Sequence, residues 1–164
     1  MSTRTHLTGA RRSRMYALIT VFALGLMAAP AVIADDVPAI NSFDVGPDGR
    51  VWAPAGGPLS GFDSSGGVTR LDLATGAETP VALSFPTEPA RTGFAYPVAA
   101  KFGPDGSLYV LQGFDAAVFR IDPATGATER VVNIPGNVGD NLAFLGARLF
   151  ASQFFGQVVE VQPG

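Results

Sequence analysis

The sequence predicts an all-β protein built from consecutive four-stranded antiparallel units. Three observations lead to this fold class. The stretch from Ala99 to Gly126 contains two tight-turn motifs separated by apolar runs, and recognisable copies of it lie upstream and downstream. The 20 glycines and 13 prolines among 164 residues also imply many turns.

The first turn motif is Gly-Pro-Asp-Gly at Gly103–Gly106. Proline presets φ at the second position, aspartate tolerates the third, and glycine closes the turn without a Cβ clash. We therefore expect an antiparallel hairpin here. The residues that follow, Leu108–Leu111, are apolar or aromatic at every position. This pattern favours a strand that is covered on both faces.

The rest of the stretch predicts two more strands. Val118–Ile121 is the expected third strand, Asp122–Gly126 the second tight turn, and Glu129–Val132 the fourth strand. Four short antiparallel strands in about 40 residues is the size of one blade of a β-propeller.

The copies define the domain organisation. Val45 precedes Phe102 by 57 residues, whereas Phe102 precedes Phe144 by 42, and three insertions in the first copy account for the difference. We expect blades at about 41–83, 97–132 and 139–164 within a domain that covers 35–164. By this alignment the last blade is truncated before its fourth strand.

These motifs, together with the Arg-Ile-Asp-Pro-Ala-Thr-Gly string at Arg120–Gly126, resemble a propeller superfamily. It includes NHL-repeat proteins, the SMP-30/gluconolactonase group and streptogramin lyases, and the resemblance covers about Asn41 to Gly164. It implies wheels of six or seven blades, often with a divalent metal in the central channel. It also implies activities from lactone hydrolysis to ring-opening elimination, alongside members that only bind.

One copy of the chain is too short to close a wheel, since propellers have about four to eight blades. Three alternatives follow: a fragment of a longer protein, a partial propeller that completes itself by self-association, or an open stack of sheets. Exposed blade faces would favour pairing between copies.

Residues 1–34 are predicted to be an export signal. Basic residues precede an apolar run over Met15–Ala29, and Val32–Ala34 offers a small-residue cleavage site. The alternative is an uncleaved anchor, but the run is short for the roughly 20 apolar residues of a span. We expect a periplasmic or extracellular protein with no stable membrane span after cleavage. The general secretory route fits better than twin-arginine export.

Composition excludes several functions. Without residues 1–34 the chain keeps seven basic residues against 14 acidic ones, a formal charge of −7, which argues against nucleic-acid binding. There are no cysteines, and the one histidine, His6, lies in the predicted signal. Disulfides, thiolate metal sites, cysteine nucleophiles and imidazole bases are therefore absent from the expected mature chain.

Long connections indicate where a ligand would bind. Ala53–Gly67 and Phe85–Tyr96 are both expected on one side of the blades, which we call the long-loop face, and a small molecule or protein would bind there. The candidate ligand-binding residues are Asp63, Asp115 and Arg91. The aspartates recur in Gly-Phe-Asp strings, where the alternative role is capping of the loop backbone. For Arg91 the alternative is a solvated loop charge.

Aligning the first strands places Asn41, Val98 and Asp140 at one position, just before the innermost strand of each blade. The SMP-30-like group has a metal-binding asparagine at a matching place, so the resemblance implies Asn41 and Asp140 as metal ligands. Oxygen donors suit Ca²⁺ or Mg²⁺. The alternative is that both residues are ordinary turn formers.

Two functions remain open. The first is an exported propeller segment that acts as a ligand- or protein-binding scaffold, as part of a longer six- or seven-bladed protein. The second is a metal-dependent hydrolase like the SMP-30/gluconolactonase group or a lyase like the streptogramin lyases, or an inactive remnant of one. The missing histidine and cysteine favour no catalysis by this chain alone. A second alignment places Arg70 and Arg120 at one strand position and Glu160 at the same position of the next copy, which suggests salt bridges between blades. The alternative is a contact between these arginines and a substrate anion.

Overall fold

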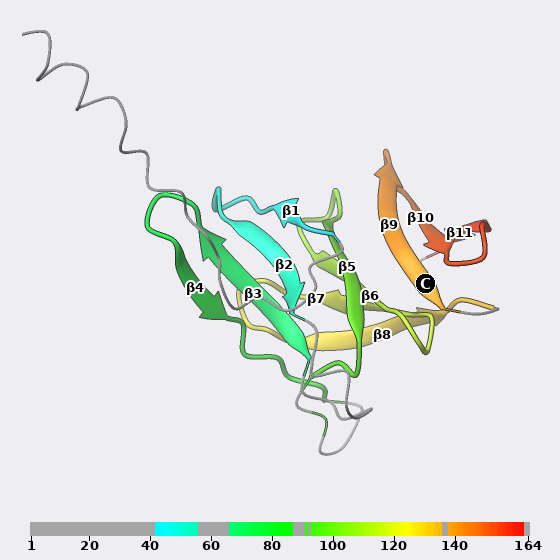
Figure 1. Ribbon diagram of the computed structural model, residues 1–164, viewed down its shortest axis with the longest axis horizontal. Helices are drawn as coiled ribbons and strands as arrows, with labels where there is room; N and C mark the ends of the chain where they lie inside the picture. Colours follow the sequence, from blue (N-terminus) through cyan, green and yellow to red (C-terminus); the bar gives the residue numbers. More distant parts are fainter. Residues whose placement is uncertain (1–41, 56–65, 87–90, 92, 136–137, 163–164) are drawn as a thin grey trace, which may run out of the picture. The chain divides into compact units, whose positions relative to one another are not determined.

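The computed structural model describes residues 42–55, 66–86, 91, 93–135 and 138–162. These residues form eleven strands and no helix, and the strands are arranged in three antiparallel sheets (Figure 1). None of the described residues belongs to a helix that could cross a membrane. The predicted export signal at 1–34 lies outside the described residues and stays a prediction.

The strands follow the predicted order. The first sheet contains β1 (Asp44–Val45), β2 (Val51–Ala55), β3 (Gly67–Asp72) and β4 (Ala77–Pro80). The second sheet contains β5 (Pro97–Phe102), β6 (Leu108–Gln112), β7 (Ala117–Ile121) and β8 (Thr128–Asn133). The third sheet contains β9 (Gly139–Leu145), β10 (Arg148–Gln153) and β11 (Val158–Val161).

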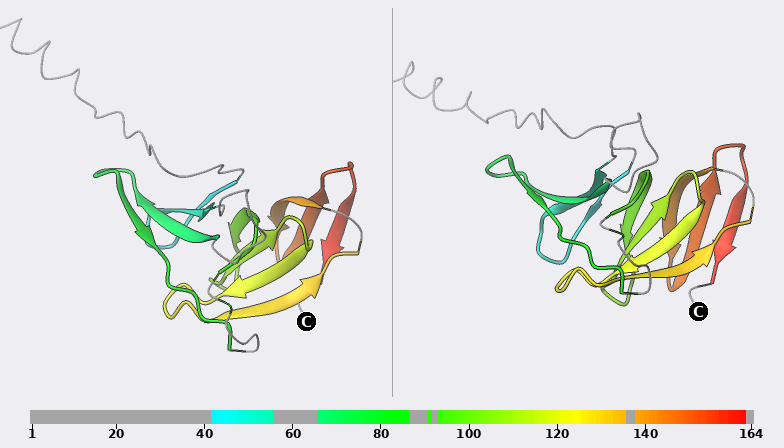
Figure 2. Two further views of the ribbon diagram at one scale, coloured as in Figure 1. Left: turned by 60° about the horizontal axis from the view of Figure 1, so that its bottom comes forward. Right: turned by 90° about the horizontal axis from the view of Figure 1, so that it is seen from below.

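Within each sheet, every strand pairs with the next one along the chain, which is the order of a propeller blade (Figure 2). The predicted all-β class of successive antiparallel units is thus confirmed. The described strands form three open sheets and do not close into a ring.

The second sheet is covered on both faces, as the apolar run in β6 predicts. Leu108 and Val110 pack into a core with side chains of the first sheet, such as Trp52. Tyr109 and Leu111 point the opposite way, into a core with side chains of the third sheet. Consecutive residues of one strand therefore join two different cores, because side chains alternate across a sheet.

Both predicted turn motifs form tight hairpins. In the first, Asp105 Oδ1 accepts a hydrogen bond of 3.1 Å from Ser107 N, and Gly106 has a φ of 79°. In the second, Asp122 Oδ1 accepts from Ala124 N at 2.8 Å, and Gly126 has a φ of 73°. The left-handed conformation at the closing residue explains why glycine stands there.

An aromatic side chain joins each hairpin to the next sheet. Tyr109 donates a hydrogen bond of 3.1 Å to Asp105 Oδ2, and its ring meets Phe144 of the third sheet edge-on, with centroids 5.2 Å apart. One sheet earlier, Trp52 Nε1 donates to Asp48 Oδ1 at 3.1 Å, and the Trp52 ring meets Phe102 at 5.5 Å and 90°. The same contact is therefore repeated at both interfaces between sheets.

The connection between the first and second sheets contributes two aromatic side chains to the core. Phe85 and Phe94 are 8% and 0% exposed, and both rings pack edge-on against Phe119 of β7. Ser84 also pairs with Ala127 through a parallel bridge. Phe85 and Phe94 of the predicted long loop thus belong to the core between two sheets, because burial of their apolar rings lowers the free energy of the fold.

The predicted salt bridges between blades are wrong. Arg120 pairs with Glu129 at 2.6 Å on the neighbouring strand of its own sheet. Glu160 pairs in the same way with Arg148, also at 2.6 Å. Arg120 stands directly opposite Glu129, whereas Arg148 reaches Glu160 diagonally, since Glu160 stands opposite Phe150. In both cases the two charged residues lie on neighbouring strands of one sheet, which brings them within reach of each other.

The Tyr109 hydrogen bond makes a testable contribution to stability at neutral pH. Partial burial raises the pKa of Asp105, but hydrogen bonds from Ser107 and Tyr109 outweigh it and hold the pKa below its usual range. A lowered pKa stabilises the fold above the unfolded-state value of about 3.9, and this contribution is lost as the pH falls through the folded-state value.

We expect Tyr109→Phe to lower the free energy of unfolding by about 1 kcal/mol at pH 7. The difference from the wild type should shrink at pH 3, below the unfolded-state pKa of about 3.9, because Asp105 of the unfolded chain is then largely protonated and the lowered folded-state pKa stabilises less. Urea denaturation at both pH values measures it. An equal difference at the two pH values would contradict a role for the charged Asp105.

Gly126 is predicted to tolerate substitution less well than Gly106, although both have a positive φ. A Cβ at Gly126 would overlap the carbonyl oxygen of Ala82, whereas a Cβ at Gly106 would meet open space. We expect Gly106→Ala to cost roughly 1–2 kcal/mol, the cost of a left-handed non-glycine residue. Gly126→Ala should cost clearly more in thermal or urea unfolding. Equal costs would show that the chain near Ala82 does not pack on this turn.

Candidate functional site

The connections on the long-loop face are tied together by backbone hydrogen bonds. Phe94 N donates to Gly66 O at 2.6 Å, which links the connections before β3 and β5. Gly113 of the β6–β7 turn donates to Tyr96 O and accepts from Gly139 N, both at 2.8 Å. These hydrogen bonds join described parts of neighbouring connections to one another.

A cavity of about 700 Å³ opens on this face between the second and third sheets. Its walls come from the connections before β5 and β9 and from the turns after β6 and β10. The lining residues are Tyr96, Val98, Phe114, Val138, Gly139, Asp140, Asn141, Phe154 and Phe155.

Four aromatic side chains form most of the apolar wall. The rings of Tyr96 and Phe114 lie 4.9 Å apart between centroids, and those of Phe154 and Phe155 lie 5.6 Å apart at 89°. Phe114, Phe154 and Phe155 are 48%, 71% and 73% exposed. Large aromatic side chains that gather at this exposure in one place are typical of an interaction site.

Asp140 is the one charged residue among the described residues that line the cavity. It is exposed, and its Oδ2 accepts a long hydrogen bond of 3.4 Å from Ser152 Oγ. The neighbouring Asn141 uses its side-chain oxygen to accept from Leu142 N at 2.8 Å. The carboxylate of Asp140 is therefore the polar group most available to a bound molecule.

A buried glutamine brings two of the predicted ligand-binding residues together. Gln112, which is 0% exposed, donates from Nε2 to Asp115 Oδ2 at 2.8 Å and accepts at Oε1 from Arg91 Nη2 at 3.1 Å. A buried amide is stable only when its polar atoms are paired, so these contacts fix the rim of the long-loop face.

Arg91 is packed and half-buried. Its Nε donates to Gly93 O at 3.2 Å, and its guanidinium lies over the rings of Phe85 and Phe119, at 5.6 and 5.3 Å from their centroids. It is thus held above the core between the first two sheets. Its expected role in ligand binding stays a prediction.

The remaining predicted site residues are not brought together in the described part of the chain. Asn41 and Asp63 lie outside it. Asp140 lies at the cavity, but the described residues contain no group of three or more His, Cys, Asp or Glu side chains that could hold a metal. Because Ca²⁺ takes six to eight oxygen ligands, Asp140 and its described neighbours do not fit a calcium site by themselves.

Sequence reasoning missed Gln112 and the aromatic wall. A glutamine closes the second strand in two copies: Gln112 ends β6, and Gln153 ends β10 and donates to Pro135 O at 2.7 Å. A polar residue that recurs at the end of an apolar strand was the available signal. Phe114 belongs to one of the recurring Gly-Phe-Asp strings, whereas Tyr96 and Phe154 carried no comparable pattern.

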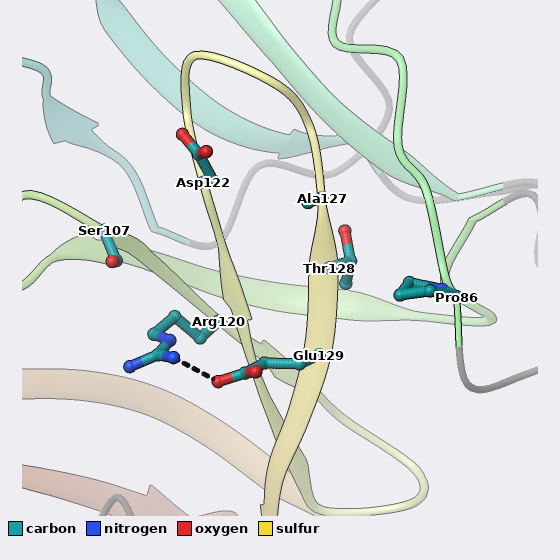
Figure 3. Close-up of a pocket in the computed structure, with 7 residues that line it drawn as sticks. All are labelled: Pro86, Ser107, Arg120, Asp122, Ala127, Thr128 and Glu129. Carbon is teal, nitrogen blue, oxygen red and sulfur yellow. Dashed lines mark ion pairs between the residues drawn. The ribbon is translucent and has the colours of Figure 1, made fainter.

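A second cavity, of about 450 Å³, lies at the β7–β8 hairpin (Figure 3). Figure 3 shows Arg120 and Glu129 pointing toward each other from neighbouring strands, with their ion pair of 2.6 Å. Asp122 in the same wall accepts from Ala124 N and Thr125 Oγ1, both at 2.8 Å. Its charged groups already satisfy one another, so this cavity is the weaker candidate for a ligand.

Comparison with known proteins supports the fold. No protein-family profile and no curated protein matches the sequence. Among solved structures, the WD40 β-propeller domain of Doa1 is similar, with a TM-score of 0.52 and 14% identity over 74% of this chain and 36% of that chain.

Two further structures are similar. The extracellular domain of a putative one-component system from B. thetaiotaomicron has a TM-score of 0.53 and 12% identity over 76% of this chain and 17% of that chain. A luciferin-regenerating enzyme has a TM-score of 0.51 and 14% identity over 72% of this chain and 40% of that chain.

The chain spans less than half the length of each of these three structures. At such low identity the likeness concerns the fold alone. Together with the three open sheets, it identifies the chain as an incomplete β-propeller, which confirms the predicted fold class.

The role of Gln112 can be tested by Gln112→Leu, which keeps the volume of the side chain but leaves Asp115 and Arg91 without this partner. We expect a loss of about 1–3 kcal/mol in the free energy of unfolding, measured with urea. Asp115→Asn, which keeps an acceptor for Gln112, is the matched control and should cost less. A neutral effect of Gln112→Leu would show that the buried amide does not hold this rim.

Proposed function

We propose that the chain is a ligand-binding segment of a β-propeller and that its site is the cavity between the second and third sheets. The observation that carries this proposal is the convergence of four aromatic side chains and one carboxylate around about 700 Å³. The aromatic side chains come from three different connections on the long-loop face, and Asp140 comes from the start of β9.

The size of the cavity favours a small molecule over a protein. Ligand pockets commonly have volumes of about 300–1,000 Å³ and combine apolar walls with few polar groups. Here the rings of Phe154 and Phe155 supply apolar area, and Asp140 and Asn141 supply polar groups at the side. Burial of exposed ring surface against a ligand would drive binding.

The wider setting of this site rests on the sequence and on one neighbour. The predicted signal at 1–34 supports export, and one structure of similar fold is an extracellular domain. The sequence resemblance supports membership in the NHL and SMP-30/gluconolactonase group. It also supports a place within a longer six- or seven-bladed protein. Self-association would be the other way to supply further blades.

Metal-dependent hydrolysis or elimination is the alternative function. It needs a divalent ion to polarise a carbonyl or activate water, because the expected mature chain has no imidazole or thiol. Asp140 could give one ligand, and its sequence partner Asn41 lies outside the described residues. The binding function therefore has the stronger support.

The proposal predicts that a neutral apolar dye, Nile red, binds in the cavity. Titration of the protein with the dye, followed by fluorescence, should give a saturable signal that Phe154→Ala weakens several-fold. Leu145→Ala is the matched control, because Leu145 is 67% exposed at the opposite end of β9 from the cavity. Both variants remove exposed side chains, so melting temperatures should stay close to that of the wild type.

The Leu145→Ala control distinguishes binding in the cavity from nonspecific binding of the dye to exposed apolar side chains. If Leu145→Ala lowers dye binding as much as Phe154→Ala, the dye reports exposed apolar area and the cavity is not a binding site.

A further inference from the structure

We propose that the ligand of this cavity is a small organic cation of the quaternary ammonium class. The inference rests on the proposed function and adds the charge of the ligand. The cavity combines aromatic rings with a carboxylate. A neutral ligand would gain only from contact with the rings, and both groups would repel an anionic ligand.

The first feature is the aromatic wall. Two ring pairs, Tyr96 with Phe114 and Phe154 with Phe155, line one cavity from different connections. The faces of aromatic rings carry negative charge density, and several rings around one space attract a cation that is too weakly hydrated to prefer water. Methylated ammonium groups have this property, and their methyl groups also bury apolar area.

The second feature is the charge of the lining. Among the described residues that line it, Asp140 is the one with a charge, and none is a lysine or an arginine. The carboxylate keeps most of its acceptor capacity, because its hydrogen bond to Ser152 Oγ is long, at 3.4 Å. Its neighbour Asn141 is neutral, so the described lining has a net negative charge at Asp140.

The third feature is that cations elsewhere in the described structure are already engaged. Arg148 lies over the ring of Phe150 at 4.9 Å and pairs with Glu160. Arg70 lies over Trp52 at 5.3 Å. In both pairs the arginine lies over an aromatic ring of its own sheet. At the cavity, rings and a carboxylate occur together, and the described part of the lining contributes no arginine or lysine.

An anionic ligand is disfavoured by the same arrangement. It would meet Asp140 and the ring faces, both of which repel negative charge. A neutral apolar ligand would use the rings alone. A hydrophobic cation uses the rings and the carboxylate, so it gains from every group that distinguishes this cavity.

The test compares choline with its neutral carbon isostere, 3,3-dimethylbutan-1-ol, on the full chain. The two molecules share shape and a hydroxyl group and differ in charge. Binding is followed by proton NMR titration of the aromatic resonances. We expect choline to bind at least tenfold more tightly than the alcohol, and Phe154→Ala to weaken both.

The carboxylate is tested by Asp140→Asn. We expect it to weaken choline several-fold and to leave the alcohol unchanged. The matched control is Glu78→Gln, which removes the same charge from an exposed position on β4 of the first sheet. It should leave both affinities unchanged, since exposed charges more than about 10 Å apart are screened at 0.1 M salt.

The choline experiment tests the charge of the ligand, and the Nile red experiment tests the cavity as a binding site, so the two can fail independently. If choline binds no more tightly than the alcohol, or if Glu78→Gln weakens choline as much as Asp140→Asn, the cation inference is overturned. Saturable binding of Nile red that depends on Phe154 would then still support the cavity as a site. If the dye shows no such dependence either, the proposed function fails as well.

Discussion

The structure depends on one contact that recurs between successive sheets: an aromatic ring that lies over a tight turn and meets a phenylalanine of the next sheet. Tyr109 and Trp52 occupy this position, and the turn aspartates Asp105 and Asp48 accept their hydrogen bonds. A Cβ at Gly103 would lie 2.6 Å from the Tyr109 ring. The glycine that opens the motif therefore serves the packing of the ring, and the aspartate satisfies its polar atom.

This contact also explains how the long-loop face acquires a cavity. The aromatic contacts hold the sheets together near the short turns, and Leu111 and Gly139 meet closely farther along. Beyond them, the second and third sheets are lined by connections with larger side chains, such as Phe114 and Phe154. In this fold the tight turns are used for packing, and the variable connections are left to carry a site.

The third copy of the repeat departs from the other two in an informative way. It lacks the Gly-Pro-Asp-Gly turn, and Phe150 stands where Tyr109 stands in the second copy. Arg148 covers the Phe150 ring and is held by Glu160, whose pKa is lowered by the hydrogen bond from that arginine. A stacked cation thus takes the place that a turn aspartate and a neighbouring ring occupy elsewhere.

The sequence by itself determined the strands, the turns and the succession of sheets, because these depend on local patterns: apolar runs, Gly-Pro-Asp-Gly and Asp-Pro-Ala-Thr-Gly. It also singled out Arg91, Asp115 and Asp140 on the long-loop face. Only the tertiary structure decided what joins them. Gln112 links Arg91 to Asp115, Phe85 and Phe94 turn a predicted loop into core, and Phe154 meets Asp140 at one cavity. These contacts lie between residues of different connections, and no local pattern records which connections lie side by side.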